Sequence, residues 1–354
     1  MLFIYNKGQR QTTKVKLLCV VNNMKITNNM IDSDLRLRGE MIRVINPLGS
    51  YGMQGIMGRI SKIALGALPL RSMNCTKTEI RRKNGTYFKA CIFKSKNANE
   101  NAIGILWLHG GGYVMGAPEM AVMTMPKALL QKFNCVIICP DYTLSTDAPY
   151  PAAVEDAYRT LQWMSNNRKK LGIGYEKFAV GGESAGGGLA AALCIYARDK
   201  GNASIAFQMP LYPMLDDRVT KTSCCNDAPL WNTAANTAAW ERYLGPLYGS
   251  DEVSAYAAPA RLDDFTNLPP AVSVIGTIEP FYEETIKYFK SLYSVGTEAR
   301  LQIESGCFHA FDMVAPSSAA AKRARSFLLL AFEDYAEKYI KAKKLKLSLT
   351  NRNV

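Results

Sequence analysis

The sequence contains very little histidine: only His109 and His309 occur among 354 residues. Zinc sites combine Cys and His at short, regular spacings, and the nine cysteines show no such spacing, so we expect no metal site. An odd number of cysteines scattered through mostly apolar stretches is typical of reduced thiols, which predicts a cytoplasmic protein. The cysteines stand at positions 19, 75, 91, 135, 139, 194, 224, 225 and 307.

Long hydrophobic runs are also missing from the chain. No segment approaches the ~20 apolar residues that a membrane-spanning helix needs. The longest apolar run near the start, Leu17 to Val21, is too short for the core of a signal peptide. The sequence therefore predicts no stable insertion into a membrane.

Acidic residues are scarce in the first 100 positions, which hold 5 Asp and Glu against 18 Lys and Arg. The remaining residues are balanced, so the net charge of +13 belongs to the N-terminal part. A basic segment can bind nucleic acid or an anionic membrane surface. No aromatic residues interleave the basic ones as a stacking surface would need, so we predict a solvated end and no nucleic-acid partner. Binding through this basic part is kept as an alternative, and it would be sensitive to salt.

Short apolar runs rich in β-branched residues alternate with helical patterns along most of the chain. Asn84-Gly85 predicts a hairpin between the first two expected strands, 78–82 and 87–93. The later strands read as parallel strands covered on both faces. They span 103–108, 135–139, 177–180, 205–209, 271–275 and 299–303, with helices over 123–132, 152–170, 185–197, 283–295 and 319–341. This order predicts an α/β protein with one large open sheet and a site beyond the carboxyl ends of its strands.

Two segments interrupt this alternation, and we expect both to form a cap over the site. The first has a helical pattern in which Ile56, Ile60 and Ile63 are spaced for one helix face. The second follows a strand end. The expected division is an N-terminal segment with cap helices over 1–70, an α/β core of 71–211 and 248–345, a cap insertion over 212–247 and a basic tail, 346–354.

Gly182-Glu183-Ser184-Ala185-Gly186 lies between an apolar run and an Ala-rich helical run. That order predicts a strand, a sharp turn and a helix, the setting in which a G-x-S-x-G turn lifts its serine oxygen clear of the sheet. A serine hydroxyl attacks only when a base takes its proton. Taken alone, the pattern also fits a glycine-rich turn that caps a helix.

Both histidines fall where serine chemistry would use them. His109 opens His109-Gly110-Gly111-Gly112 directly after an expected strand, and that pattern supplies oxyanion donors in esterases. His309 lies near the C-terminus, where the chain order Ser, acid, His places the base.

Five motifs in this order resemble the hormone-sensitive-lipase-like branch of the α/β-hydrolases, of the bacterial acetyl-esterase type. The resemblance implies the α/β-hydrolase fold, with a mostly parallel eight-stranded sheet flanked by helices and a helical cap. The first 40 residues take no part in it. The matching residues are His109 to Tyr113 with Gly116 and Pro118, Asp141-Tyr142 with Tyr150 to Asp156, Gly182 to Gly187, Tyr212 to Asp217, and Cys307 to Asp312.

The resemblance implies Ser184 as the nucleophile, His309 as the base and an acid in the turn Gly276-Thr277-Ile278-Glu279-Pro280. The family usually has aspartate where Glu279 stands. Glutamate serves as the acid in other hydrolases of this fold, but its side chain is one methylene longer, so the loop or the rotamer must differ. Three competing acids are expected to be helix-start or surface groups: Glu283, Glu284 and Asp312.

The expected oxyanion donors are Gly111, Gly112 and the amide of Ala185, because glycine lets backbone N–H groups point at a developing negative charge. His109 is expected to hold its loop rather than to transfer protons. Five residues are candidates to line the substrate pocket, with ordinary core or cap packing as the alternative for each: Tyr113, Tyr142, Met214, Trp231 and Phe281.

These residues predict a carboxylic-ester hydrolase for short acyl chains, acting on a small-molecule ester through an acyl-serine intermediate, with no cofactor. The same machinery acting on an amide, as in an N-acetyl deacetylase, is the first alternative. A non-catalytic small-molecule receptor on this scaffold is the second, although such a receptor would be expected to have lost its base. A homodimer is one possible assembly.

Overall fold

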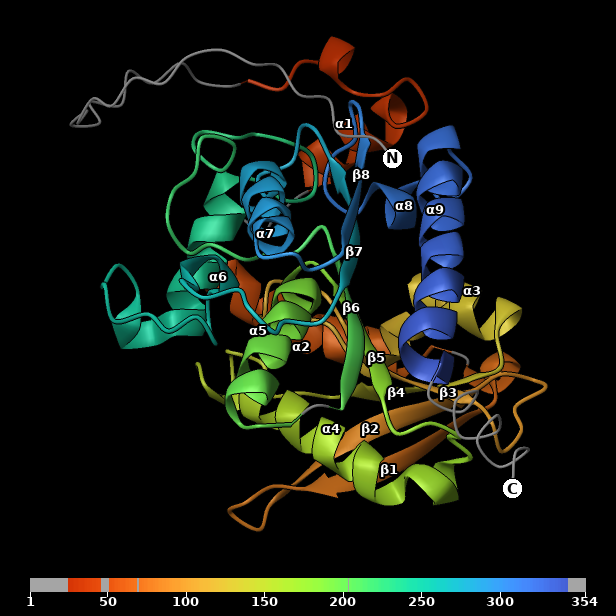
Figure 1. The fold of residues 1–354 in the computed structure, drawn as a ribbon. Coiled ribbons are helices and arrows are strands. Elements are labelled where there is room, and N and C mark those ends of the chain that lie inside the picture. The colour runs from red at the N-terminus through yellow and green to blue at the C-terminus, as the bar shows by residue number, and fades with distance from the viewer. Residues whose placement is uncertain (1–24, 46–50, 69, 203, 343–354) are drawn as a thin grey trace, which may run out of the picture.

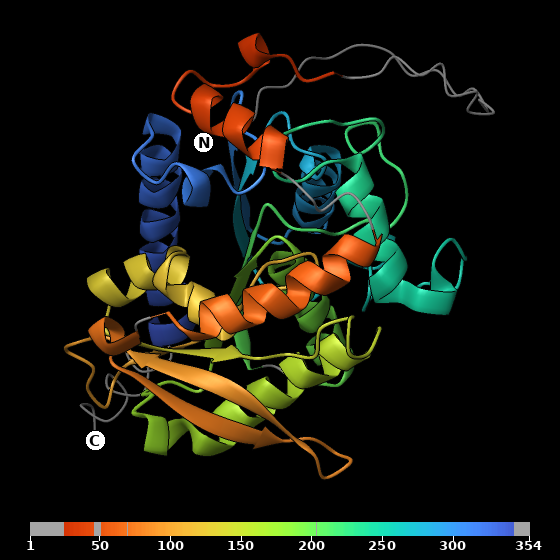
Figure 2. The same cartoon turned by 180° about the vertical axis from the view of Figure 1, so that it is seen from behind.

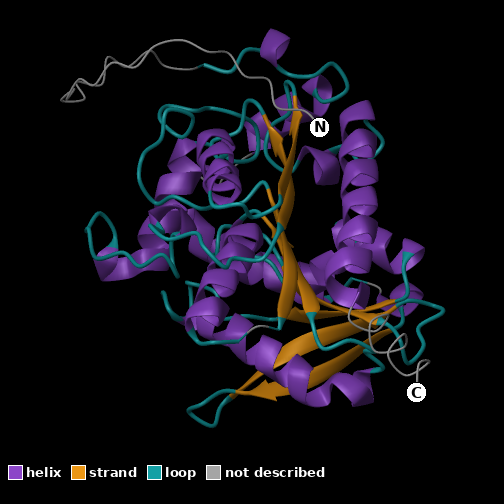
Figure 3. Cartoon of the chain, in the orientation of Figure 1, coloured by secondary structure: helices purple, strands orange, loops and turns teal. Residues whose placement is uncertain are grey.

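The computed structural model describes residues 25–45, 51–68, 70–202 and 204–342. Cys19 and the predicted basic tail, 346–354, lie outside these residues. The chain forms one twisted sheet with helices packed on both of its faces (Figure 1; Figure 3).

The sheet has eight strands in the order β1-β2-β4-β3-β5-β6-β7-β8. β1 and β2 form the predicted hairpin around Asn84-Gly85, β2 also runs antiparallel to β4, and the other pairs are parallel. The mostly parallel sheet of the predicted α/β fold is therefore confirmed. The strands are β1 Cys75–Arg81, β2 Tyr87–Lys94, β3 Ile103–Leu108, β4 Cys135–Pro140, β5 Phe178–Glu183, β6 Ile205–Leu211, β7 Ala271–Gly276 and β8 Ala299–Glu304.

Helices cover both faces of the central strands, which is why β3 to β7 are buried along their whole length. On one face lie α4, α5 and α7, and on the other lie α3 and α9 (Figure 1). The helices are α1 Arg36–Ile45, α2 Tyr51–Gly66, α3 Met125–Lys132, α4 Ala152–Leu171, α5 Ala185–Asp199, α6 Thr233–Leu244, α7 Tyr282–Ser294, α8 Phe311–Val314 and α9 Ala319–Tyr335.

The prediction that the last strand is covered on both faces is wrong. β8 stands at the end of the sheet, most of its residues are only half-buried, and the side chain of Ile303 is 46% exposed. An apolar run predicts a strand, but its period does not distinguish an edge strand from a central one.

The N-terminal helix α2 lies beside α6, where the Gln54 side-chain amide donates to the Ala235 carbonyl over 2.9 Å (Figure 2). The isoleucines Ile56, Ile60 and Ile63 do share one face of α2, but they are 54%, 52% and 77% exposed. The opposite face of α2 packs against the loop after β3 through Gly58, where an added Cβ would lie 2.4 Å from the Val114 carbonyl oxygen. Because the small residue faces the protein, the isoleucines face outward.

Within the described residues, every helix is too short or too polar to cross a bilayer. The division into core and cap stays a prediction.

Candidate active site

Ser184 occupies a sharp turn between β5 and α5, with φ 59° and ψ −121°. This is a strained conformation for a residue with a side chain, and it persists only where the surroundings hold it. The neighbouring glycines permit close packing: a Cβ on Gly182 would lie 2.4 Å from the Leu108 carbonyl oxygen, and one on Gly186 would lie 2.1 Å from it. The Ser184 carbonyl also accepts from the Met214 N–H over 3.0 Å. The turn is therefore held by both neighbouring strands.

The register of the parallel strands brings the neighbouring loops to the same edge as this turn. Leu108 at the end of β3 pairs with Gly182, and Glu183 pairs with Leu211 at the end of β6. Strands β3, β5 and β6 thus end level with one another, and their loops gather around Ser184, as expected for an open α/β sheet.

His309 lies between Ser184 and Glu279. Its Nε2 is 2.8 Å from the Ser184 Oγ, and its Nδ1 is 2.6 Å from the Glu279 Oε2. A carboxylate only accepts hydrogen bonds, so Nδ1 carries the hydrogen and Nε2 faces the hydroxyl as an acceptor. All three side chains are buried. The structure brings the nucleophile, base and acid predicted from the sequence into one hydrogen-bonded chain.

The longer acid side chain is accommodated by folding back on its own loop. Glu279 Oε1 accepts from the Gly276 N–H over 2.9 Å, which leaves Oε2 directed at His309. Burial raises the pKa of Glu279, while the His309 charge, the hydrogen bond to His309 and the Gly276 N–H act in the opposite direction. The loop is also joined to the one that carries His309, because the Thr277 N–H donates to the Glu304 carbonyl over 3.0 Å.

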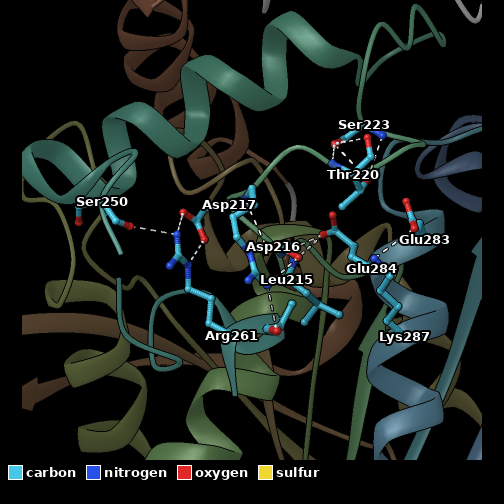
Figure 4. Close-up of polar contacts among 12 residues, drawn as sticks. Leu215, Asp216, Asp217, Thr220, Ser223, Ser250, Arg261, Glu283, Glu284 and Lys287 are labelled. Atoms are coloured by element: carbon cyan, nitrogen blue, oxygen red, sulfur yellow. Dashed lines mark hydrogen bonds and ion pairs between the residues drawn. The ribbon is translucent and has the colours of Figure 1, made fainter. Parts of the chain in front are cut away.

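The three competing acids lie elsewhere. Glu283 and Glu284 stand in the first turn of α7 and Asp312 in the first turn of α8, so all three are helix-start groups as expected. Glu284 is nevertheless fully buried, and Asp312 is half-buried. Glu284 Oε1 accepts from the Leu215 N–H over 2.7 Å, and Glu283 pairs with Lys287 at 3.1 Å (Figure 4). The helix-start pattern located these acids along the chain, but it carried no information about what covers them.

The loop after β3 runs directly beside the nucleophile. A Cβ on Gly110 would lie 2.9 Å from the Glu183 carbonyl oxygen and 3.3 Å from the Ser184 Cβ. Gly111 and Gly112 have φ of 119° and 61°, a region that favours glycine. Ala185 is buried at the first position of α5, where backbone N–H groups have no partner within the helix. The predicted oxyanion residues therefore flank Ser184.

His109 lies beneath this loop rather than in the hydrogen-bonded chain. Its Nδ1 donates to the Gly110 carbonyl over 2.8 Å, and its ring stacks on Tyr142 at 4.2 Å between centroids. Burial lowers the pKa of His109 to about 4, so the ring is neutral near pH 7. The Tyr142 hydroxyl donates to the His109 carbonyl over 2.7 Å. The His109 and Tyr142 side chains therefore hold the loop after β3 in place through these hydrogen bonds and the ring stacking.

The candidate pocket residues divide into two groups. Phe281 meets the His309 ring edge-on at 5.0 Å, and Trp231 lies 6.3 Å from the same ring. Tyr113 instead stacks on Tyr243 of α6 at 3.8 Å, fully buried. Met214 is also fully buried, and Tyr142 holds the loop after β3. Among the candidate pocket residues, Trp231 and Phe281 are therefore the two that border the His309 ring.

Sequence reasoning gave no role to Tyr212, although it follows β6 within one of the recognised motifs. Its ring meets His309 edge-on at 5.1 Å, and its hydroxyl donates to Asp312 Oδ1 over 3.0 Å. Tyr212 also has φ 33°.

Sequence reasoning also gave no role to Trp107, whose Nε1 donates to the buried Glu183 over 2.8 Å. The only signal in the sequence was that Tyr212 follows the end of β6 and that Trp107 lies at the end of β3, beside the site.

Comparison with known proteins agrees with this arrangement. A family model described as alpha/beta hydrolase fold matches residues 105–313. The chain is 30% identical to the esterase LipI of Mycobacterium tuberculosis over 229 residues, which cover 64% of this chain and 71% of that protein. It is 25% identical to an arylesterase of Saccharolobus solfataricus over 264 residues, 74% of this chain and 85% of that one.

Solved structures agree as well. A bacterial heroin esterase superposes with a TM-score of 0.77 at 28% identity, covering 88% of this chain and 99% of that one. An esterase of Pyrobaculum calidifontis gives a TM-score of 0.71 at 26% identity, covering 85% and 98%. The chain therefore belongs to the α/β-hydrolase fold family, in its hormone-sensitive-lipase-like branch.

Proposed function

We propose that this chain is a serine carboxylesterase that hydrolyses short-acyl esters through Ser184, His309 and Glu279. Carboxylic-ester hydrolysis is supported by relatives named esterase and carboxylesterase over most of the chain. The observation that carries the assignment of residues is the pair of distances at His309, 2.8 Å to the Ser184 Oγ and 2.6 Å to the Glu279 Oε2.

In the first half-reaction, Ser184 Oγ attacks the ester carbonyl carbon while His309 Nε2 takes the hydroxyl proton. Glu279 holds the ring in the tautomer with hydrogen on Nδ1 and stabilises the imidazolium that forms. His309 then returns the proton to the departing alkoxide oxygen, which leaves as an alcohol. In the second half-reaction, water attacks the acyl-serine by the same steps and releases the carboxylic acid.

The negative charge on the carbonyl oxygen is placed near the backbone N–H groups of Gly111, Gly112 and Ala185. The positive φ at both glycines, and the close approach of this loop to the Ser184 turn, support this role. Removing one such donor typically costs about 3–4 kcal/mol of transition-state stabilisation. His109 takes no proton in this scheme, because its ring nitrogen Nδ1 donates to Gly110.

Preference for short acyl chains is supported by the aromatic pair Trp231 and Phe281. The Trp231 ring covers the oxyanion loop so closely that a Cβ on Gly112 would lie 2.3 Å from its Cη2. Trp231 is buried, and its Nε1 donates to the Asn236 Oδ1 of α6 over 3.4 Å. A long acyl chain would need this wall to move.

An acyl-chain series on the purified protein tests the proposal. We expect kcat/KM for p-nitrophenyl esters to be highest between acetyl and hexanoyl, and Trp231→Ala to shift the preference toward longer chains. Faster turnover of emulsified long-chain triglyceride than of dissolved butyrate ester would contradict it. Parallel assays on an N-acetyl amide separate the esterase from the deacetylase alternative, which needs the same residues. A homodimer and a cytoplasmic location stay predictions.

A further inference from the structure

Cys224 and Cys225 are neighbours in the sequence, and their sulfur atoms lie 3.6 Å apart. In a strand, consecutive side chains point to opposite faces. Here Cys225 has φ 55°, so the chain turns and both sulfurs lie close together. Both residues are half-buried, which leaves the pair within reach of a small reagent in water.

The other cysteines in the described part of the chain offer no comparable pair to solvent. Cys75 is half-buried, but its neighbour on β2, Cys91, is buried. Burial raises the pKa of the remaining thiols, that of Cys135 to about 12, so they are neutral and shielded. These buried thiols are Cys135, Cys139, Cys194 and Cys307.

The geometry of the pair favours a one-atom bridge over a disulfide. Consecutive Cα atoms are about 3.8 Å apart, whereas disulfides usually join Cα atoms roughly 4.4–6.8 Å apart. Two sulfurs bound to one tetrahedral zinc, with bonds of about 2.3 Å, are roughly 3.8 Å apart. The observed 3.6 Å is close to that value. The separation is that of an S–H···S contact between two thiols, and it leaves both sulfurs within reach of one atom placed between them.

A structural zinc ion would need four ligands. No group of three or more His, Cys, Asp or Glu residues placed for a metal ion occurs in the described residues. An atom bound by the two sulfurs alone would therefore have to carry its remaining substituents with it. A trivalent arsenic atom that carries an organic group meets this requirement with two sulfurs.

We propose that Cys224 and Cys225 form a dithiol site for trivalent organoarsenicals and that occupancy slows the esterase. The reagent R–As=O forms two As–S bonds, its arsenic–oxygen bond breaks, and the oxygen leaves as water with the two thiol protons. Arsenic remains trivalent, so no oxidant or reductant is needed.

The dithiol interrupts the segment that holds the loop carrying Glu279, so the effect on activity rests on the proposed function. Before the pair, the Thr222 hydroxyl donates to the Pro280 carbonyl over 2.8 Å and accepts from the Glu283 N–H over 3.1 Å. After the pair, the Asn226 side-chain amide donates to the Ile278 carbonyl over 3.1 Å. A bridge joins the two side chains into one ring and adds an organic group between these two attachments, so Glu279 shifts relative to His309.

Uptake of phenylarsine oxide by the full-length chain, followed by intact-protein mass spectrometry, tests the site. We expect one phenylarsenic group per chain, released by the dithiol 2,3-dimercaptopropanol but not by an equal concentration of 2-mercaptoethanol. Cys224→Ser and Cys225→Ser should each lose this uptake, and Cys75→Ser should keep it. Unchanged uptake in the first two variants, or loss in Cys75→Ser, would overturn the site.

The effect on activity is measured separately, as the initial rate on a dissolved acetyl ester. We expect kcat to fall about tenfold on uptake, which is less than the roughly 10²-fold loss that a 1 Å misplacement of a catalytic group can cause. Cys224→Ala, Cys225→Ala and the two serine variants should resist the reagent while keeping wild-type melting temperatures. Uptake at the pair with unchanged kcat overturns the coupling. Uptake by a wild-type chain that has no esterase activity before treatment contradicts the proposed function and leaves the dithiol site standing.

Discussion

The loop after β3 and the loop after β7 approach Ser184 from opposite sides of β5, and they are held differently. The first closes on its own backbone: the N–H groups of Val114 and Met115 both donate to the Gly111 carbonyl over 3.0 Å. The second is attached on one side to the end of β8 and on the other to Thr222 and Asn226 of the segment between β6 and α6.

The two loops are therefore positioned by different kinds of contact. The oxyanion side is positioned by buried contacts within the hydrolase core, such as the one between Tyr142 and His109. The acid side depends on the segment that carries Thr222 and Asn226, which is half-buried at several positions. We therefore expect changes on the oxyanion side to affect folding and catalysis together, and changes in this segment to affect catalysis with little loss of stability.

The largest effect is expected where the two sides meet. Ser184→Ala should lower kcat on an acetyl ester by about 10⁴-fold or more, because no acyl-serine can form without the Ser184 Oγ and only the contribution of the oxyanion loop remains. The melting temperature should stay near that of the wild-type chain, since a hydroxyl is removed without a change of backbone. A purified, folded variant that retains a tenth of the wild-type turnover would exclude Ser184 as the nucleophile.

Glu279→Gln tests the acid side directly. Glutamine keeps the size but removes the charge that stabilises the imidazolium, and loss of a triad carboxylate can cost about 10⁴ in kcat. The matched control is Glu283→Gln, four residues along the chain, whose side chain points to Lys287 and should leave kcat near wild type. Glu279→Asp should also lose activity, because the carboxylate bonded to Gly276 would no longer reach His309. A silent Glu279→Gln beside an inactive Asp312→Asn would reverse the assignment.

Gly112→Ala tests the oxyanion side. The new Cβ would lie 2.3 Å from Trp231 and would sit at φ 61°, so the loop must shift. We expect kcat to fall by about 10²–10³-fold, the loss that accompanies one missing oxyanion donor. Gly85→Ala is the control: it carries a similar positive φ, 87°, in the β1–β2 hairpin, and should cost stability without changing kcat. Equal kcat values for the two variants would contradict the role of the loop.

Much of this site could be predicted because its chemistry is local in sequence. Two histidines and one G-x-S-x-G turn left few choices for Ser184 and His309, and a parallel sheet brings strand ends together whatever the loops contain. Burial by distant segments could not be predicted. The sequence places Glu284 at a helix start, but it does not show that the Leu215 N–H donates to this buried side chain. It predicts a strand at Ile303, but it does not show that β8 is an edge strand. The pairing of Cys224 with Cys225 depends on a single positive φ that the residue type does not announce.

Deletion of one hydroxyl on each side sharpens the comparison. Tyr142→Phe removes a buried donor to His109, and we expect a loss of about 1–2 kcal/mol in the free energy of unfolding. Thr222→Val removes a half-buried hydroxyl that bonds to Pro280, and we expect about a threefold lower kcat with a smaller change in melting temperature. Thermal melts and initial rates on the same preparations check both. A Thr222→Val variant that loses stability but not kcat would show that the hydrogen bond from Thr222 to Pro280 does not position Glu279.

The last expected effect is on stability and its pH dependence rather than on kcat, and it concerns a buried carboxyl group on the oxyanion side, Glu183, which accepts from Trp107 on β3 over 2.8 Å. Burial raises the pKa of Glu183 to about 8, whereas in the unfolded chain a glutamate ionises near pH 4.3. Between these values the folded chain binds more protons than the unfolded chain, so this group makes the protein less stable as the pH rises. Glutamine stays neutral and still accepts from Trp107. The melting temperature of Glu183→Gln relative to wild type should therefore increase from pH 5 to pH 8.5, by about 2–4 °C for each kcal/mol removed. The exposed Glu176→Gln should follow the wild-type curve. A difference between Glu183→Gln and wild type that stays constant over this range would mean that Glu183 is ionised throughout, and that the core side of the site carries its charge without penalty.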